Sequence, residues 1–108
     1  MDFSVRIIEV VELMPNTRSG NHLASQLIRS GTSPALNYAE AQGAESRSDF
    51  IHKMKISLKE LWETHVCLQI IQRKPLIADL SLLGSIMKEN DELISIFVKS
   101  IATAQSKK

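Results

Sequence analysis

The sequence is poor in the residues that mark secreted, metal-binding or membrane-embedded domains. Cys67 is the single cysteine among 108 residues, which excludes an internal disulfide and a zinc site built from cysteines and fits a reducing compartment. No apolar run approaches the roughly 18 residues that a membrane-spanning helix needs. The first residues, which include Asp2, Arg6 and Glu9, lack the layout of a secretory signal. We therefore expect a cytoplasmic protein that has no contact with a membrane.

Neither sign of charge dominates, because 13 lysines and arginines stand against 12 aspartates and glutamates and give a net charge of +1. The chain therefore lacks the overall basic field that by itself would indicate nucleic-acid binding, and any such site must come from local clustering. Hydrophobic residues make up 44% and charged residues 23% of the chain, as in ordinary folded domains. At this length we expect one domain with one core over residues 1–104, followed by a frayed polar tail over residues 105–108.

Glycine and proline are also scarce, at four and three residues, and no strand-like alternation of apolar and polar residues occurs. Apolar residues instead recur every three or four positions, which is the spacing of one face of a helix. This pattern predicts helices over residues 3–14, 17–42, 46–73 and 79–104. Four helices joined by short connections predict an all-α fold, an antiparallel up-and-down four-helix bundle.

Residues that favour helix ends support these boundaries. Thr17, Ser46 and Asp79 are suitable N-terminal caps, and Gly43 is suited to end the second helix. Pro34 interrupts the second helix, because proline lacks a backbone donor and disfavours helical geometry in the residue before it. Either one helix kinks near Pro34 or two short helices meet there, and we expect the kinked helix.

The apolar positions indicate which face of each helix is buried. In the first helix this face is predicted to hold Val5, Ile8 and Val11. The strongest stripe in the chain alternates steps of three and four residues along the third helix, a pattern typical of bundles. Its members are Ile51, Met54, Leu58, Leu61, His65 and Leu68. The predicted core face of the last helix holds Leu83, Ile86 or Met87, Ile94, Phe97 and Ile101.

Catalytic and metal-binding patterns are missing. A di-iron site in such a bundle needs two acid-x-x-His pairs on different helices, but Asp49 and His52 form the single pair in this sequence. His65 lies within the apolar stripe, where we expect a core or interface histidine that makes one hydrogen bond. No glycine-rich phosphate loop, nucleophile elbow or isolated pair of carboxylates is present. We therefore expect no enzymatic activity, no metal, no cofactor and no small-molecule substrate.

A second face of the third helix combines basic and apolar residues. Positions 52, 55, 59, 62 and 66 lie on one side of a helix, and residues 47–59 hold four lysines and arginines against one aspartate. One interpretation is a surface that contacts the phosphates of RNA or DNA, with Trp62 as a stacking group. The other is a solvated face on which Trp62 is simply packed and lysines pair with acids, as Lys59 could with Glu63. The candidate nucleic-acid-binding residues are Arg47, His52, Lys53, Lys55 and Lys59.

The third helix also has more apolar surface than one bundle seam requires. Trp62, Val66 and Ile70 follow one another on a side separate from the apolar stripe. Extra apolar surface of this kind on a small soluble bundle usually becomes a subunit interface. These three residues are therefore the candidate interface of a homo-oligomer.

One stretch of the sequence matches a known family without gaps, from the second helix to the middle of the third. The matching residues are Arg29 to Ser33, Ala35, Asn37, Tyr38, Glu40, Ala41, Ala44 to Arg47, Asp49 to Lys53, Leu58 to Glu60, Glu63 and Thr64. The join over residues 13–20 agrees as well. In these residues the chain resembles the bacterial four-helix bundle family, which is also called the ribosomal RNA intervening-sequence protein family.

The resemblance implies a four-helix bundle that assembles as a homo-oligomer, typically a ring of five, and that has no catalytic activity. A related protein of similar fold, the accessory variability determinant of diversity-generating retroelements, works with a reverse transcriptase and RNA through a basic surface. Together with the residue patterns, the resemblance predicts a non-catalytic homo-oligomer, a pentamer, that contacts RNA or DNA through its basic surface. The alternative is an oligomeric scaffold that binds proteins and makes no nucleic-acid contact.

Overall fold

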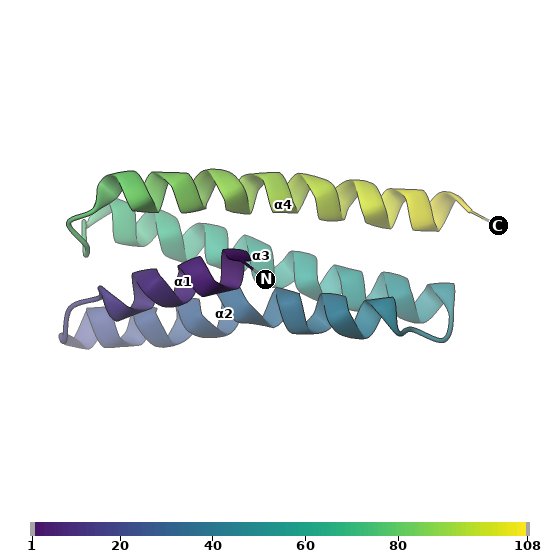
Figure 1. The fold of residues 1–108 in the computed structure, drawn as a ribbon, viewed down its shortest axis with the longest axis horizontal. Helices are drawn as coiled ribbons and strands as arrows, with labels where there is room; N and C mark the ends of the chain where they lie inside the picture. The colour runs from purple at the N-terminus through teal and green to yellow at the C-terminus, as the bar shows by residue number, and fades with distance from the viewer. Residues whose placement is uncertain (1, 108) are drawn as a thin grey trace.

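Four helices account for most of the chain in the computed structural model, which describes residues 2–107. They are α1 (Asp2–Glu12), α2 (Arg18–Gln42), α3 (Arg47–Arg73) and α4 (Leu80–Ser106). Short connections make successive helices run antiparallel, and α3 lies between α2 and α4 along the 49 Å length of the molecule (Figure 1). The predicted all-α four-helix fold is confirmed.

Three of the helices begin at the side-chain caps that the sequence predicts. In each case the side-chain oxygen accepts a hydrogen bond from the backbone amide three residues later, at 3.0 Å for Thr17, 3.1 Å for Ser46 and 2.9 Å for Asp79. Each bond satisfies an amide that has no partner inside its helix, which contributes about 1 kcal/mol. Gly43 caps the C-terminal end of α2, also as predicted.

α2 continues through Pro34, so the alternative of two short helices is wrong. The proline nitrogen carries no hydrogen, and the carbonyl of Ser30, four residues earlier, therefore lacks its usual donor inside the helix. Both residues are buried against α3, where Ser57 Oγ lies 3.4 Å from the carbonyl oxygen of Pro34 and Thr64 Oγ1 lies 3.0 Å from Ser30 Oγ. Packing of small side chains against α3 thus stabilises α2 where the proline weakens it.

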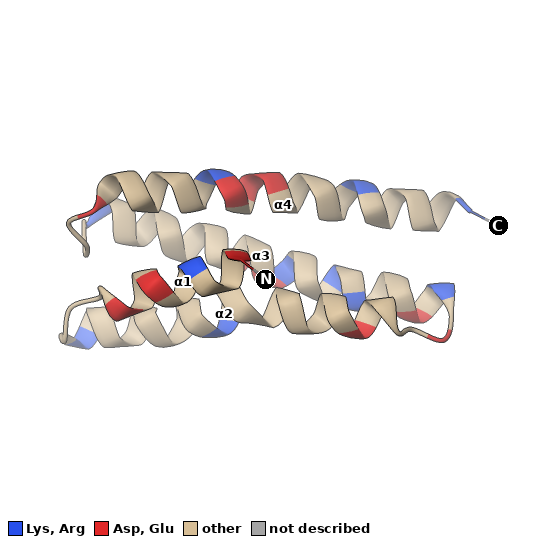
Figure 2. Cartoon of the chain, in the orientation of Figure 1, with Lys and Arg blue, Asp and Glu red and all other residues tan. Residues whose placement is uncertain are grey.

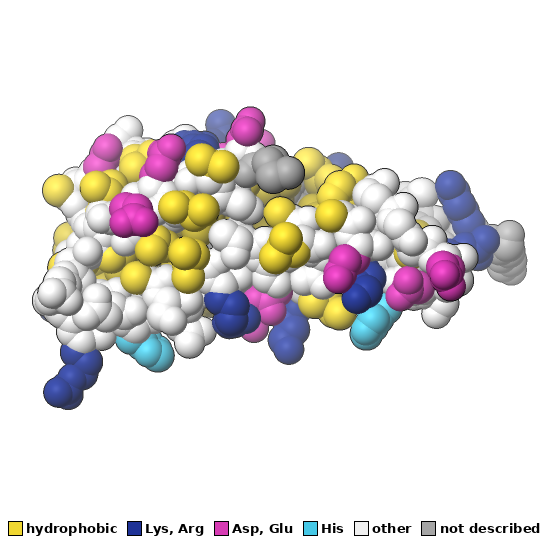
Figure 3. Space-filling view, turned by 60° about the horizontal axis from the view of Figure 1, so that its bottom comes forward, with side chains coloured by type: hydrophobic (Ala, Val, Ile, Leu, Met, Phe, Trp, Pro, Cys, Tyr) yellow, Lys and Arg dark blue, Asp and Glu magenta, His cyan; other side chains and the backbone are white. Residues whose placement is uncertain are grey.

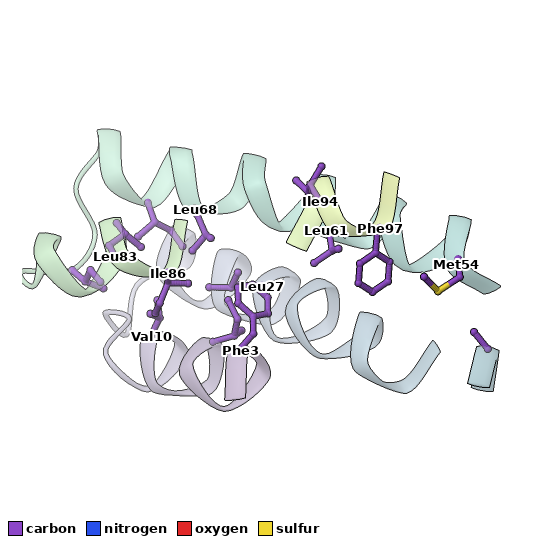
Figure 4. Close-up of a cluster of buried hydrophobic side chains, with 14 of the residues drawn as sticks. Phe3, Val10, Leu27, Met54, Leu61, Leu68, Leu83, Ile86, Ile94 and Phe97 are labelled. Carbon is purple, nitrogen blue, oxygen red and sulfur yellow. The ribbon is translucent and has the colours of Figure 1, made fainter. Parts of the chain in front are cut away.

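The core follows the bundle from α1 to the far end of α4, but its face on α3 differs from the predicted stripe (Figure 4). Alternate members of the stripe, beginning with Met54, are buried, whereas the others, beginning with Ile51, are only half-buried. Ser57 and Thr64 are fully buried instead. α3 packs against α2 as well as α4, so its buried arc is wider than the stripe and extends toward α2.

The predicted apolar face of α1 is wrong. Val5 and Ile8 are exposed, at 52% and 40% of their surface, and Figure 3 shows hydrophobic side chains on the surface where α1 lies on α2. The buried residues of α1 are Phe3, Ile7 and Val10. Because α1 carries apolar residues on more than one face, its spacing alone does not select the buried one. Contact with Gly31 of α2 selects the buried face, since Ile7 packs into the space that a side chain at Gly31 would occupy.

Polar contacts join the helices at one level of the bundle, near the start of α1. Ser4 Oγ donates to the carbonyl oxygen of Gly31 in α2 at 3.1 Å, and Arg6 donates to Glu89 in α4 at 2.5 Å. The Thr64 hydroxyl, bonded to α2 as described above, adds α3 to the same level. Each of these bonds links residues that are far apart in the sequence, so together they fix how far each helix is shifted along its neighbours.

Asn90 completes this polar level from α4. It is fully buried, and its Nδ2 donates to the carbonyl oxygen of Leu61 in α3 at 3.1 Å. Its Oδ1 is buried and has no hydrogen-bond partner among residues 2–107. Asn90 was not among the residues predicted for the core face of α4, although it is buried on that face between Ile86 and Ile94. Of the two alternatives in that prediction, Ile86 is buried and Met87 is only half-buried.

The helices differ in length, and this difference shapes the molecule. α1 has 11 residues, whereas α2, α3 and α4 have 25, 27 and 27. α1 therefore covers only part of the bundle, and beyond its N-terminal end the molecule is built from three helices (Figure 1). α4 runs to Ser106, past its predicted end; of the predicted frayed tail, Lys108 lies outside the described residues. Within residues 2–107, no helix is both long and apolar enough to cross a membrane.

Candidate interaction surfaces

An exposed row of side chains runs along the outer side of α3, and we call it the α3 ridge. Its members are His52, Lys55, Lys59, Trp62, Val66 and Ile70, all exposed. Successive members are three or four residues apart, which places them on one face of the helix. The buried residues of α3 lie on the opposite face, and α3 packs against α2 and α4 but not against α1. The ridge therefore points away from the rest of the chain.

The structure brings together three of the five predicted nucleic-acid-binding residues. Those at positions 52, 55 and 59 lie in the N-terminal half of the ridge, on the basic half of α3 (Figure 2). Lys53 lies on another face, where its Nζ is 3.2 Å from Glu40 of α2. Arg47, at the start of α3, donates to the backbone carbonyl of Lys107 beyond the end of α4. These two cations are thus occupied by partners within the chain.

Lys55 and Lys59 form no ion pair with any residue that the structure describes. The suggested pairing of Lys59 with Glu63 is absent, because Glu63 and Glu60 both bind Arg29 of α2, at 2.7 and 2.9 Å. The hydrogen bond to Glu63 and the charge of Glu60 raise the pKa of Arg29 above its ordinary value. Glu60 and Glu63 therefore bind α2 and not the ridge, and Lys55 and Lys59 remain available to an anionic partner.

The C-terminal half of the ridge is apolar. Trp62, Val66 and Ile70 expose 50%, 52% and 45% of their surface, so the interpretation of Trp62 as a simply packed residue does not hold. The ring of Trp62 meets that of His65 edge-on, at 5.6 Å between centroids. A hollow of about 560 Å³ between α2 and α3 lies beside Trp62 and reaches Cys67. The apolar half thus has both a protruding aromatic ring and a recess next to it.

Nothing in the described part of the chain gathers the ligands of a metal ion, since no three His, Cys, Asp or Glu residues cluster within residues 2–107. His65 Nδ1 lies 3.3 Å from Asp91 Oδ1 across the contact between α3 and α4. The half-buried thiol of Cys67 has its pKa raised, chiefly by burial, which favours the unreactive protonated form. His65 thus lies between two helices, and Cys67 packs against the core.

A second surface, a recess that the sequence did not predict, lies beside the N-terminal start of α1. Two adjoining hollows of about 430 and 640 Å³ open between α2 and α4 and share Ser100; we call them together the trough. Met54 of α3 lies at its floor, and its walls include Ile96, which is 58% exposed, and Tyr38, whose ring lies 5.8 Å from that of Phe97. In Figure 4, Met54 and Phe97 lie farther along the bundle than Phe3. The signal of the trough in the sequence is the pair Leu93 and Ile96, apolar residues that flank the core face of the last helix and line the trough.

These features define a small four-helix protein with one protruding and one recessed surface. The sequence pattern of the 23S rRNA-intervening sequence protein family matches residues 1–99, and the chain belongs to this family. It is also similar to a crystal structure from Bacteroides thetaiotaomicron VPI-5482, that of a protein of unknown function from the S23 ribosomal protein family. The two are 34% identical over 93% of this chain and 92% of that one, with a TM-score of 0.84. Among curated proteins, none matches the chain significantly.

Proposed function

We propose that the protein is a non-catalytic homo-oligomer that assembles through the apolar half of the α3 ridge and contacts RNA through the basic half. The observation that carries this proposal is the ridge itself. It combines two lysines that have no partner among the described residues with three large apolar side chains that are about half exposed. All of them lie on a face that no other helix of the chain covers.

The apolar half favours self-association. Ile70 lies eight residues after Trp62, or about 12 Å further along the helix. Leaving this row in water costs free energy that burial against another subunit would recover, and tryptophan is enriched among the residues that contribute most to interfaces. The ring of five is the assembly that the family resemblance implies. A ring would repeat the basic half of the ridge at regular intervals, so that several weak phosphate contacts could act on one RNA.

The basic half favours an anionic partner. Lys55 and Lys59 lie about 6 Å apart along one face of α3, and neither is neutralised by a described residue. The near-neutral total charge restricts this attraction to the ridge, which predicts weak binding that depends strongly on salt. RNA is the first nucleic acid to test, because the family description refers to an intervening sequence of 23S rRNA.

Titration with single-stranded RNA at two salt concentrations tests this claim. We expect affinity to fall as salt rises, and the double substitution Lys55→Ala, Lys59→Ala to weaken binding equally for all sequences. It should also reduce the slope of log affinity against log salt by on the order of 1. Lys99→Ala, at an exposed lysine of α4, is the control and should bind like the wild type. An unchanged affinity in the double variant would contradict the assignment of the ridge.

A scaffold that binds only proteins is the second candidate. Glu60 and Glu63 lie beside the ridge, and although both bind Arg29, they bring negative charge close to Lys59. If the assembled wild-type protein binds no RNA even at low salt, the scaffold is the better account and the basic half of the ridge has no role with nucleic acid.

A further inference from the structure

We propose that the trough of one copy receives the apolar half of the α3 ridge of a second copy, so that subunits join head to tail. This inference rests on the proposed self-assembly and states which two surfaces meet. The trough occupies the position that a longer α1 would fill, between α2 and α4 and above the inner face of α3. A helix is therefore the element that completes it.

The dimensions of the two surfaces agree. The part of α2 that α1 leaves uncovered runs from about Pro34 to the end of the helix at Gln42, eight positions later, which is about 12 Å. The row from Trp62 to Ile70 has the same length. The hollow of the trough nearer α1 has mostly apolar walls that include Tyr38 and Ile96, which are exposed in the single chain and would be covered by the incoming helix. The other hollow is more polar.

The charges beside the two surfaces are complementary. Asp2 and Glu89 are the charged residues that line the hollow of the trough nearer α1, among residues 2–107. Glu89 is paired with Arg6, whereas Asp2 forms no ion pair with a described residue. The other hollow is lined by Glu45 and by two cations, Arg47 and Lys107. On the ridge, Lys55 and Lys59 precede Trp62. An incoming ridge whose basic half lies toward α1 would therefore place its lysines on the side of Asp2, at the edge of the contact and away from Arg47 and Lys107, which favours one of the two directions in which the helix could enter.

The positions of the two surfaces determine the kind of assembly. The inner face of α3 forms the floor of the trough, whereas the ridge lies on its outer face, so the two surfaces point in opposite directions. A contact between them leaves one ridge and one trough unused in every pair. Such a heterologous contact continues from copy to copy and closes into a ring when the rotation allows. A ridge paired with another ridge would instead stop at a twofold dimer.

Two single substitutions in the full chain test the contact. Val66→Glu places a charge in the apolar half of the ridge, and Ile96→Glu places one on the wall of the trough. Their residues are 52% and 58% exposed, so both variants should keep the helical circular dichroism of the wild type. Val98→Glu is the matched control, because Val98 is 47% exposed on α4 and does not line the trough.

We expect Val66→Glu and Ile96→Glu each to lose assembly, and Val98→Glu to assemble like the wild type. Mixing the two defective variants well above the assembly concentration of the wild type should restore one contact, because one variant keeps an intact trough and the other an intact ridge. Light scattering should then give a one-to-one complex of twice the 12.1 kDa chain mass. If either glutamate variant loses its helical signal, Trp62→Ser and Tyr38→Ser repeat the test without an added charge.

The failures of the two proposals differ. If Ile96→Glu assembles normally, or if the mixed variants stay monomeric while the wild type assembles, the trough does not receive the ridge, although self-assembly stands. If the wild type is itself a monomer at the same concentration, the head-to-tail contact and the proposed assembly both fail.

Discussion

Gly31 allows α1 to lie directly against α2. A Cβ atom at this position would come within 2.6 and 2.9 Å of two carbons of Ile7, which is fully buried. Because Ile7 is β-branched and closely packed, it has little freedom to move away. We expect Gly31→Ala to lower the free energy of unfolding by about 1–3 kcal/mol, as overpacked cores do, although alanine favours the helix by about 1 kcal/mol.

Gly84 provides the matched control for this prediction. It also lies inside a helix, but a Cβ atom there would meet no other atom within 4 Å. Gly84→Ala should therefore raise the free energy of unfolding by about 0.5–1 kcal/mol through helix propensity alone. Urea denaturation of both variants measures the difference. A stabilisation of equal size in both would show that the contact between Gly31 and Ile7 is not tight.

Residues differ in how well the sequence predicts their roles, and the reason is locality. The caps Thr17, Ser46 and Asp79 could be predicted, because each bonds an amide three residues later. The burial of Ser57 and Thr64 could not, because it depends on small residues of α2 that lie more than 20 positions away. Serine and threonine also look like surface residues when only their polarity is considered.

A buried hydrogen bond from Asn90 joins α4 to α3. The amide nitrogen of Asn90 donates to the Leu61 carbonyl. Because the side chain is fully buried, water could not solvate a charge at this position. Asn90→Asp keeps the shape but replaces this donor with a carboxylate that faces the carbonyl. We expect this substitution to lower the free energy of unfolding by at least about 3 kcal/mol at neutral pH, because burial of a carboxylate raises its pKa by several units.

The pH dependence of this variant follows from the sign of the shift. A carboxylate whose pKa is raised in the folded state lowers the free energy of unfolding only at pH values where it ionises in the unfolded chain. The loss of stability should therefore shrink as the pH falls toward about 4, the pKa of aspartate in the unfolded chain. Asn21→Asp is the control, because Asn21 is exposed in the first turn of α2, where a negative charge is favourable. Equal stability of the two variants in urea at neutral pH would contradict the role of Asn90.

Among the helices, sequence periodicity predicted α3 better than α1. The α3 ridge follows from spacing alone, because its residues lie opposite the buried face. Lys53 and Arg47 are close to the ridge in sequence but lie on other faces, where Glu40 and the Lys107 carbonyl bind them. In α1 the apolar residues are too evenly distributed for spacing to decide, and the buried face is set by contact with α2.

At the scale of the whole molecule, the family and the four-helix fold could be predicted, whereas the trough could not. The trough depends on where the start of α1 lies against α2 and α4, which is set by long-range contacts such as those of Ser4 and Arg6. A protein of this shape presents the apolar half of the α3 ridge and the apolar hollow of the trough to solvent. The proposed assembly covers both surfaces and leaves the lysines at the edge of each contact.

Whether the wild-type protein assembles can be decided from its mass in solution. Light scattering coupled to size exclusion at several protein concentrations gives this mass without reference to molecular shape. We expect an assembly of several chains of 12.1 kDa, with five as the expected number. A single species of 12.1 kDa at every concentration would contradict it, because the ridge and the trough would then be exposed in the functional molecule.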